Sequence, residues 1–253
     1  MEDKIMRYRK DEKVPYRRKT FEGWIREWWK WASQLAEDEK PEDHPLNEND
    51  LKGEKLERSY LKEDDEPVVA LGTEFDKIEG SQHVLRLWKN VPKNTAIVLP
   101  LICLNVDNEE AQHSGRQRQN QNIGVFKQDI ARTFVENDSY AFAFCQIRSG
   151  SKAAAELLSK DNVDYLELSY DGITKLPKYH ELAAFRHGKD HSGQELISNG
   201  DPDSKSAGHY TIFKGENFNK GDELNITICN GANFLGKSGT RFGTKATYQL
   251  LFV

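Results

Sequence analysis

The stretch Val163-Asp-Tyr-Leu-Glu-Leu-Ser-Tyr170 alternates in character from one residue to the next, with Leu166 and Leu168 separated by Glu167. A period of two residues is typical of a β-strand that buries one face and leaves the other in water. The dipeptide Asp171-Gly172 follows directly and favours a tight turn between two strands. This part of the chain therefore predicts an antiparallel sheet.

Similar short apolar runs, separated by turn residues, recur through the rest of the chain. They lie at Val68–Leu71, His83–Trp88, Ala96–Val106, Ala141–Ile147, Tyr210–Phe213, Leu224–Cys229 and Ala246–Val253. Many short strands with few helices between them predict an antiparallel β-sandwich or jelly roll over residues 67–253. Because proline cannot donate to a sheet, Leu99-Pro-Leu predicts that its strand bends or lies at an edge.

Three segments of this chain are predicted to be helical outside the aromatic run described below. Val125, Ile130, Phe134 and Val135 have the spacing of a short amphipathic helix. Ala153–Leu158 predicts one or two helical turns, and a short helix is expected near Leu51–Leu61.

Four of the five tryptophans, Trp24, Trp28, Trp29 and Trp31, lie within eight residues. They predict an amphipathic helix over residues 20–37 with Thr20 as its N-cap. Such a wide aromatic face must dock on another surface, because each ring can bury on the order of 150–250 Å². The four tryptophans are therefore the candidate docking residues. Three surfaces stay open: the chain's own sandwich, a groove of a neighbouring subunit, and a membrane surface.

The segments on either side of this helix carry opposite charge. Residues 1–19 hold eight basic side chains and predict an extended basic arm, whereas residues 37–66 hold thirteen acids and five bases. Residues 38–66 accordingly predict an acidic linker. We expect both segments to bury too little apolar surface to be ordered alone. Either they are solvated surface, or the arm contacts an acidic partner and promotes association.

Composition narrows the class of protein. The chain has 253 residues, 37% hydrophobic and 30% charged, with a net charge of −5, so nucleic acid is an unlikely partner. It has no apolar run near the roughly 20 residues of a membrane span, and its first residues do not resemble a signal peptide. We expect a reducing compartment: cytoplasm or a virus-like particle. Cys103, Cys145 and Cys229 are accordingly expected to be free thiols.

Several short motifs occur in a recognisable order. They are Phe21-x-x-Trp24-x-x-x-Trp28-Trp29-x-Trp31, Val69-Ala-Leu-Gly72-Thr73, Val91-Pro92-Lys-Asn-Thr-Ala-Ile97-Val-Leu-Pro100, the strand and turn Leu166–Gly172, and Thr247-Tyr248-Gln-Leu250. Together they span about two thirds of the chain. Their order resembles an uncharacterised family of microbial β-sandwich proteins with an N-terminal aromatic helix. The resemblance implies the sandwich fold and carries no activity to this chain.

The sequence lacks the motifs of a phosphate loop, a nucleophile elbow or a metalloprotease helix. Its richest set of potential ligands contains four histidines and three aspartates, namely His180, His187, His191, His209, Asp190, Asp201 and Asp203. Such groups could bind a transition metal, or calcium through Asn199-x-Asp201-x-Asp203. The alternative is solvated loop histidines, because His187-Gly-Lys-Asp-His191 has no helix to aim both rings together. We predict no metal, cofactor or catalytic residue.

Two further chemistries are open to a sandwich of this composition. Hydrolysis of a glycoside needs two carboxylates across a sugar, and Glu167, Asp171 and Glu181 are available. Exposed aromatic side chains could stack on sugar rings, and the candidates are Tyr165, Tyr170, Tyr179 and Phe185. Structural roles in the core or as loop anchors are the alternative for both sets.

The pattern as a whole favours a non-enzymatic structural or assembly protein, such as a decoration or capsid-like module, that docks through its arm and Trp helix. The expected partners are further copies of the chain or a larger protein assembly. The alternative is a carbohydrate- or ligand-binding sandwich, followed by a metal-dependent enzyme. An aromatic platform open to solvent favours binding, and histidines around a cavity favour the enzyme.

Overall fold

The computed structural model describes residues 5–32, 45–46, 49–62, 65–73, 82–106, 122–138, 141–149, 156–169, 205–233 and 241–253. The strands in these residues are β1 (Arg7–Tyr8), β2 (Tyr60–Lys62), β3 (Val68–Ala70), β4 (Gln82–Val91), β5 (Ala96–Val106), β6 (Ala141–Ser149), β7 (Glu156–Ser159), β8 (Asp164–Ser169), β9 (Lys205–Phe213), β10 (Glu223–Asn233) and β11 (Arg241–Phe252). The helices are α1 (Phe21–Ala32) and α3 (Ile123–Glu136), with single 3-10 turns at η2 (Glu57–Ser59), η3 (Lys160–Asn162) and η5 (Gly215–Asn217).

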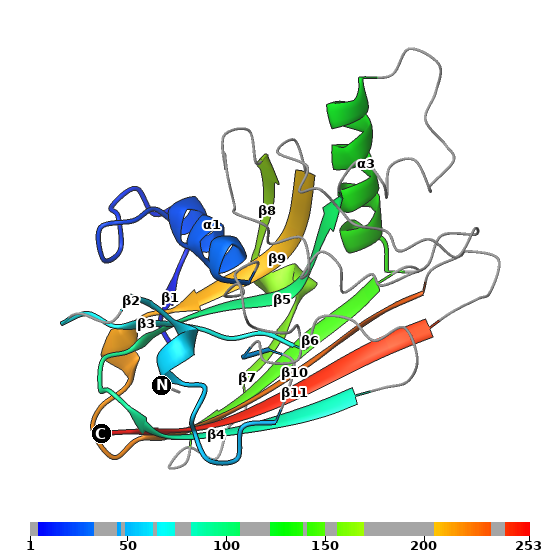
Figure 1. The fold of residues 1–253 in the computed structure, drawn as a ribbon. Helices are drawn as coiled ribbons and strands as arrows, with labels where there is room; N and C mark the ends of the chain where they lie inside the picture. The colour runs from blue at the N-terminus through cyan, green and yellow to red at the C-terminus, as the bar shows by residue number, and fades with distance from the viewer. Residues whose placement is uncertain are drawn as a thin grey trace, which may run out of the picture.

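The strands form two sheets that pack face to face, which confirms the predicted sandwich (Figure 1). One sheet has the order β1-β9-β5-β3-β2, with β8 also paired to β9, and the other has the order β4-β11-β10-β6-β7. Most pairs are antiparallel, but β3 with β5 and β4 with β11 are parallel. Pro100 lies in β5 beyond Ala96–Val98, the residues that pair with β3, and the register with β9 shifts between Pro100 and Ile102. Among the described pairings β5 therefore has a neighbour on one side only at the proline, with an irregular register there, as expected of a residue that lacks a backbone donor.

The helical turns predicted over Ala153–Leu158 are wrong in the part that the structure describes. Glu156–Ser159 is strand β7, paired antiparallel with β6. Leu158 lies opposite Cys145 and is fully buried, so sheet pairing and burial override the local helical preference.

The main core lies between the two sheets. Along β10 the alternate residues Leu224, Ile226 and Ile228 are buried and face the six-stranded sheet. Arg86 of β4 is also fully buried, and its guanidinium donates to the carbonyl oxygens of Pro45 and Leu46 and to the Tyr248 hydroxyl. The buried cation is therefore compensated by oxygen acceptors.

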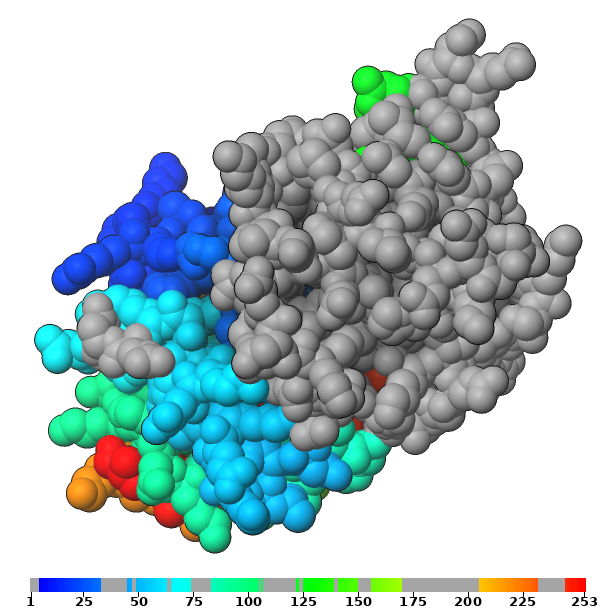
Figure 2. Space-filling view, in the orientation of Figure 1, coloured from blue at the N-terminus to red at the C-terminus, as the bar shows by residue number. Residues whose placement is uncertain are grey.

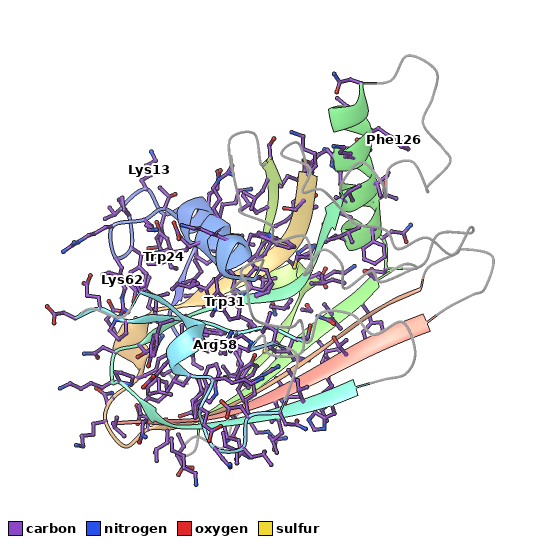
Figure 3. The ribbon with its side chains drawn as sticks, in the orientation of Figure 1. Lys13, Trp24, Trp31, Arg58, Lys62 and Phe126 are labelled. Carbon is purple, nitrogen blue, oxygen red and sulfur yellow. The ribbon has the colours of Figure 1, made fainter. Side chains whose placement is uncertain are left out.

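Helix α1 covers the outer face of the six-stranded sheet. The Thr20 hydroxyl accepts from the Gly23 backbone N–H at 3.1 Å, as expected of the predicted N-cap. The buried side of the helix packs on β3, β5, β8 and β9 in a second apolar cluster. Trp24 and Trp31 point from the helix toward the body of the molecule, and the Trp31 indole donates to the Arg58 carbonyl (Figure 3). Residues 33–37 of the predicted helix lie outside the described residues.

Residues 5–20 pack on the sandwich of their own chain, unlike the mobile arm expected from the sequence. Strand β1 pairs with β9, and Tyr8 is buried against α1. Arg9 pairs with Asp164 at 3.0 Å and Glu12 with Lys214 at 2.8 Å, so charges of both signs in this segment pair with opposite charges that lie far along the chain. In Figure 2 this N-terminal segment (blue) lies directly beside the residues coloured cyan.

The described parts of the acidic stretch are also packed. Leu46 and Leu56 are buried in the two clusters. The Asp50 carboxylate accepts from the backbone N–H groups of Gly53, Glu54 and Lys55 and from the Trp88 indole. One carboxylate that satisfies four donors can fix a local loop without a large apolar surface.

Helix α3 matches the amphipathic helix predicted near residues 125–135. It packs on β5, β9 and β6 and adds Phe126, Ala131 and Val135 to the main core. Neither α1 nor α3, nor any other helix in the described ranges, is long and apolar enough to cross a membrane.

Candidate interaction surface

The outer face of the five-stranded sheet is open to solvent, in contrast to the face that α1 covers. Along β6 the inward residues Ala141, Ala143, Cys145 and Ile147 are buried, whereas the outward residues Phe142, Phe144, Gln146 and Arg148 are exposed or half-buried. The same alternation runs through β4, β10 and β11. The sheet therefore has one face in the core and one in water.

Among the described residues, three large apolar side chains on this open face are classed as exposed. Phe142 is 50% exposed, Phe144 is 41% exposed and Leu157 is 61% exposed. The register pairs Phe144 with Ser159 and Gln146 with Leu157, so Leu157 is a diagonal neighbour of Phe144 on the same face. We call Phe142, Phe144 and Leu157 the apolar strip.

A polar ladder lies beside the strip, on β4, β11 and β10. The His83 Nε2 atom and the Thr247 hydroxyl are 3.0 Å apart, and the hydroxyls of Thr247 and Thr227 are 3.3 Å apart. Burial and the charge of Lys245 both lower the pKa of His83, so its imidazole favours the neutral form. These groups therefore hydrogen-bond one another across three strands.

The register fixes the order of side chains across the middle of the face. Cys229 on β10 lies opposite Phe144 on one side and opposite Lys245 on the other. Cys229 is half-buried, and burial raises the pKa of its thiol while Lys245 opposes the shift. An aromatic ring, a thiol and an exposed cation thus lie side by side on three adjacent strands.

Both edges of the five-stranded sheet are capped. At β7, Asn162 accepts from the Ser159 backbone N–H at 3.0 Å and donates to the Leu157 carbonyl at 3.1 Å. At β4, Asp50 exchanges backbone hydrogen bonds with Leu85 and Leu87. Edge groups that are bonded in this way resist pairing with a strand of another molecule.

The four tryptophans predicted as docking residues pack and hydrogen-bond within their own chain. Trp24, Trp28 and Trp31 are 1%, 1% and 9% exposed, and their indoles donate to the carbonyls of Tyr16, Leu71 and Arg58. Trp29 is half-buried, and its indole donates to the Tyr210 hydroxyl. Of the three surfaces left open by the sequence, the chain's own sandwich is the one that the helix contacts here.

Of the four histidines and three aspartates predicted as potential metal ligands, only His209 lies in the described residues. The His209 Nε2 atom lies 2.9 Å from Glu136, and the Tyr165 ring packs against the imidazole. The other members, namely His180, His187, His191, Asp190, Asp201 and Asp203, lie outside the described residues. Within the part of the chain that is described, no group of three or more His, Cys, Asp or Glu side chains could hold a metal.

The carboxylate and aromatic candidates are likewise partly described. Glu167 accepts from Arg132 at 2.6 Å and from the Tyr165 hydroxyl at 2.8 Å, and Arg132 lowers the pKa of this carboxyl. Both Tyr165 and Glu167 thus have structural partners. The remaining candidates lie outside the described residues: Asp171, Glu181, Tyr170, Tyr179 and Phe185.

Sequence reasoning missed the apolar strip. Residues 141–147 are predicted as a strand, and that prediction does not say which of its two faces is buried. The inward positions hold Ala141 and Ala143, and α3 packs against this strand. Small inward side chains leave room for the helix, and the rings therefore face water.

Comparison of the chain with protein-family models, with curated proteins and with solved structures found no match. The fold and the surface define the class as a mainly β sandwich with one covered and one open sheet face. The resemblance to microbial sandwich proteins stays a prediction.

Proposed function

We propose that this protein is a non-enzymatic structural or assembly module that docks through the open face of its five-stranded sheet. The observation that carries the proposal is the apolar strip, in which Phe142, Phe144 and Leu157 are each at least 41% exposed on one face. Clustered apolar side chains with a polar surround are typical of interaction surfaces. The docking role that the sequence suggested for the Trp helix therefore passes to this face.

The architecture supports a face rather than an edge as the contact. The Trp helix occupies the outer face of the other sheet, and the Asn162 side chain and the Asp50 backbone bond to groups of the two edge strands, β7 and β4. The rigid sheet holds the strip in a fixed geometry, which lowers the entropic cost of binding. We propose a homo-oligomer or a larger protein assembly, of the decoration or capsid-like kind, in the cytoplasm or in a virus-like particle.

The test replaces both rings with a residue that suits an exposed strand. The double variant Phe142→Thr/Phe144→Thr is expected to fold with an unchanged melting temperature and to lose self-association measured by multi-angle light scattering. The matched control is Val14→Thr/Leu51→Thr, which removes two exposed apolar side chains outside the face. Equal self-association of both variants and the wild type, or its absence from all three, would count against assembly through this face.

A second candidate function is binding of a carbohydrate. The observation that favours it is a set of amide side chains on the same face as the exposed rings: Gln146 lies two residues from Phe144 along β6, and Asn225 and Gln249 lie outward further along the sheet. Aromatic rings stack on sugars and amides bond their hydroxyls. Affinity electrophoresis in gels that contain neutral or acidic polysaccharides tests it, with retardation of the wild type and not of the Phe142→Thr/Phe144→Thr variant expected.

A further inference from the structure

We infer that the partner of the open face is a second copy of this chain, packed face to face about a two-fold axis that runs parallel to the strands above β10. The inference rests on the proposed function and names the occupant of the surface described there. Three properties of the face support it: its area, its hydrogen bonding and the placement of its charges.

The area of the face suits a symmetric pair. Strands spaced by about 4.8 Å, with a rise of about 3.3 Å per residue, give the four long strands β4, β11, β10 and β6, each over about eight residues, a face of roughly 19 by 26 Å. Two such faces bury roughly 1,000 Å² together, which is about the minimum for a specific interface. A partner that covered only the apolar strip would bury much less.

The hydrogen bonding of the face lowers the cost of covering it. His83, Thr247 and Thr227 already bond one another across three strands. Polar groups with partners in their own chain lose less on desolvation than groups that depend on water. A protein surface can therefore cover the polar ladder without supplying a matching donor or acceptor for each group.

The placement of charges selects the axis. Strand β10 lies at the centre of the sheet, with β6 on one side and β11 on the other. Rotation about an axis above β10 and parallel to it exchanges these neighbours, so Phe144 of one copy faces Lys245 of the second copy. An ammonium group above an aromatic ring is attractive. A two-fold axis at right angles to the strands, centred on Cys229, instead sets Lys245 against Lys245, which is repulsive.

The two arrangements respond differently to charge at position 144. In the inferred pair, Phe144→Glu faces Lys245 of the second copy, whereas Phe144→Lys opposes it. For the wild type, we expect the average molecular mass measured by sedimentation equilibrium to rise from that of one chain to that of two chains as the protein concentration increases. Phe144→Glu should retain dimers, and Phe144→Lys should dissociate at least about tenfold more readily. Melting temperatures close to that of the wild type show that both exposed substitutions leave the fold intact.

The native thiols give an independent readout. Cys229 lies under the axis, so its alkylation rate should fall as the wild-type concentration rises and should stay constant in Phe144→Lys. Cys103 lies in the six-stranded sheet and serves as the internal control, with no dependence on concentration expected.

The outcomes separate this inference from the proposed function. Equal weakening by Phe144→Glu and Phe144→Lys overturns the inferred axis, although assembly through the face survives. A mass of two chains with unchanged Cys229 alkylation overturns it in the same way. A single chain at every concentration, together with retardation by a polysaccharide, overturns the second copy as occupant and supports the carbohydrate. A single chain with no ligand response and no effect of the threonine variant overturns both proposals.

Discussion

The indole nitrogen of Trp28 donates a hydrogen bond to the carbonyl oxygen of Leu71 at 2.9 Å. This bond joins α1 to the residue that follows β3, and the ring itself is 1% exposed in the outer apolar cluster. We predict that Trp28→Ala lowers the free energy of unfolding by about 3–5 kcal/mol, as expected when a large buried aromatic side chain is removed. Urea unfolding provides the measurement.

The same substitution separates a structural from a docking role for the helix. Since Trp28 packs within its own chain, the loss should appear in stability even at concentrations where the protein is a single chain. Trp29→Ala is the matched comparison, with a smaller loss expected for a half-buried ring. A loss for Trp28→Ala below about 0.5 kcal/mol, the scale of neutral surface substitutions, would contradict the packing described above.

The N-terminal arm provides a second prediction, in which the structure reverses the expectation from the sequence. The charge pattern predicts that removal of residues 1–19 leaves the melting temperature nearly unchanged. Tyr8, however, is 1% exposed, and Arg17 donates to the carbonyls of Pro67 and Asn94. We therefore predict that Tyr8→Ala lowers the free energy of unfolding by roughly 3 kcal/mol.

Val14→Ala is the control for the arm, because Val14 is 76% exposed in the same segment. It should change stability by less than about 0.5 kcal/mol. Thermal melts of both variants at low and high salt test the contribution of the ion pairs, which should be small because their partners are partly exposed. If Tyr8→Ala has the same melting temperature as the wild type, the packing of the arm contributes nothing to stability and the arm behaves as a solvated tail.

His209 gives a prediction on pH. Burial lowers the pKa of His209 below its ordinary value of 6.5; the neighbouring Glu136 opposes the shift, the charge of Lys160 adds to it, and a hydrogen bond with the Lys160 backbone opposes it. The unfolded chain therefore takes up the proton at a higher pH than the folded chain does. Stability should be full above about pH 6.5 and fall as the pH drops toward the lowered folded pKa.

Urea midpoints measured across this interval test the His209 prediction. His209→Gln should flatten the decrease, because it removes the group whose protonation favours the unfolded state. His83→Gln is the comparison: its pKa is also lowered, but its exposed side chain should contribute much less. A decrease that is identical in wild type and His209→Gln would assign the pH dependence to other groups.

The sandwich could be predicted because strand periodicity is a local property of the sequence. Val163–Tyr170 alternates in the sequence, and β8 occupies Asp164–Ser169. Thr20 could likewise be predicted as a cap, since a hydroxyl three residues before a backbone donor is a local signal. Strand alternation and helix capping both depend on residues that are close neighbours in the sequence.

The open face and the packed arm could not be predicted, because both depend on residues far apart in sequence. The outward direction of Phe142 and Phe144 follows from α3 packing against β6, and the burial of Tyr8 follows from pairing with β9 some 200 residues later. Periodicity shows that a strand has two faces, but tertiary contacts decide which face is buried. The surface that carries the proposal was therefore visible only in the fold.

The three cysteines give the last prediction. Cys145 is fully buried, and burial raises the pKa of the Cys103 thiol to about 12. Cys229 is half-buried on the open face, where Lys245 partly offsets the rise in its pKa. Because the thiolate is the reactive form, Cys229 should react first with a disulfide reagent in the folded protein at low concentration. Cys229→Ser should remove this fast phase, whereas Cys145→Ser should retain it.

In denaturant without reductant, a thiol titration should count all three cysteines. A count of one would reveal a disulfide and contradict the reducing compartment expected from the sequence.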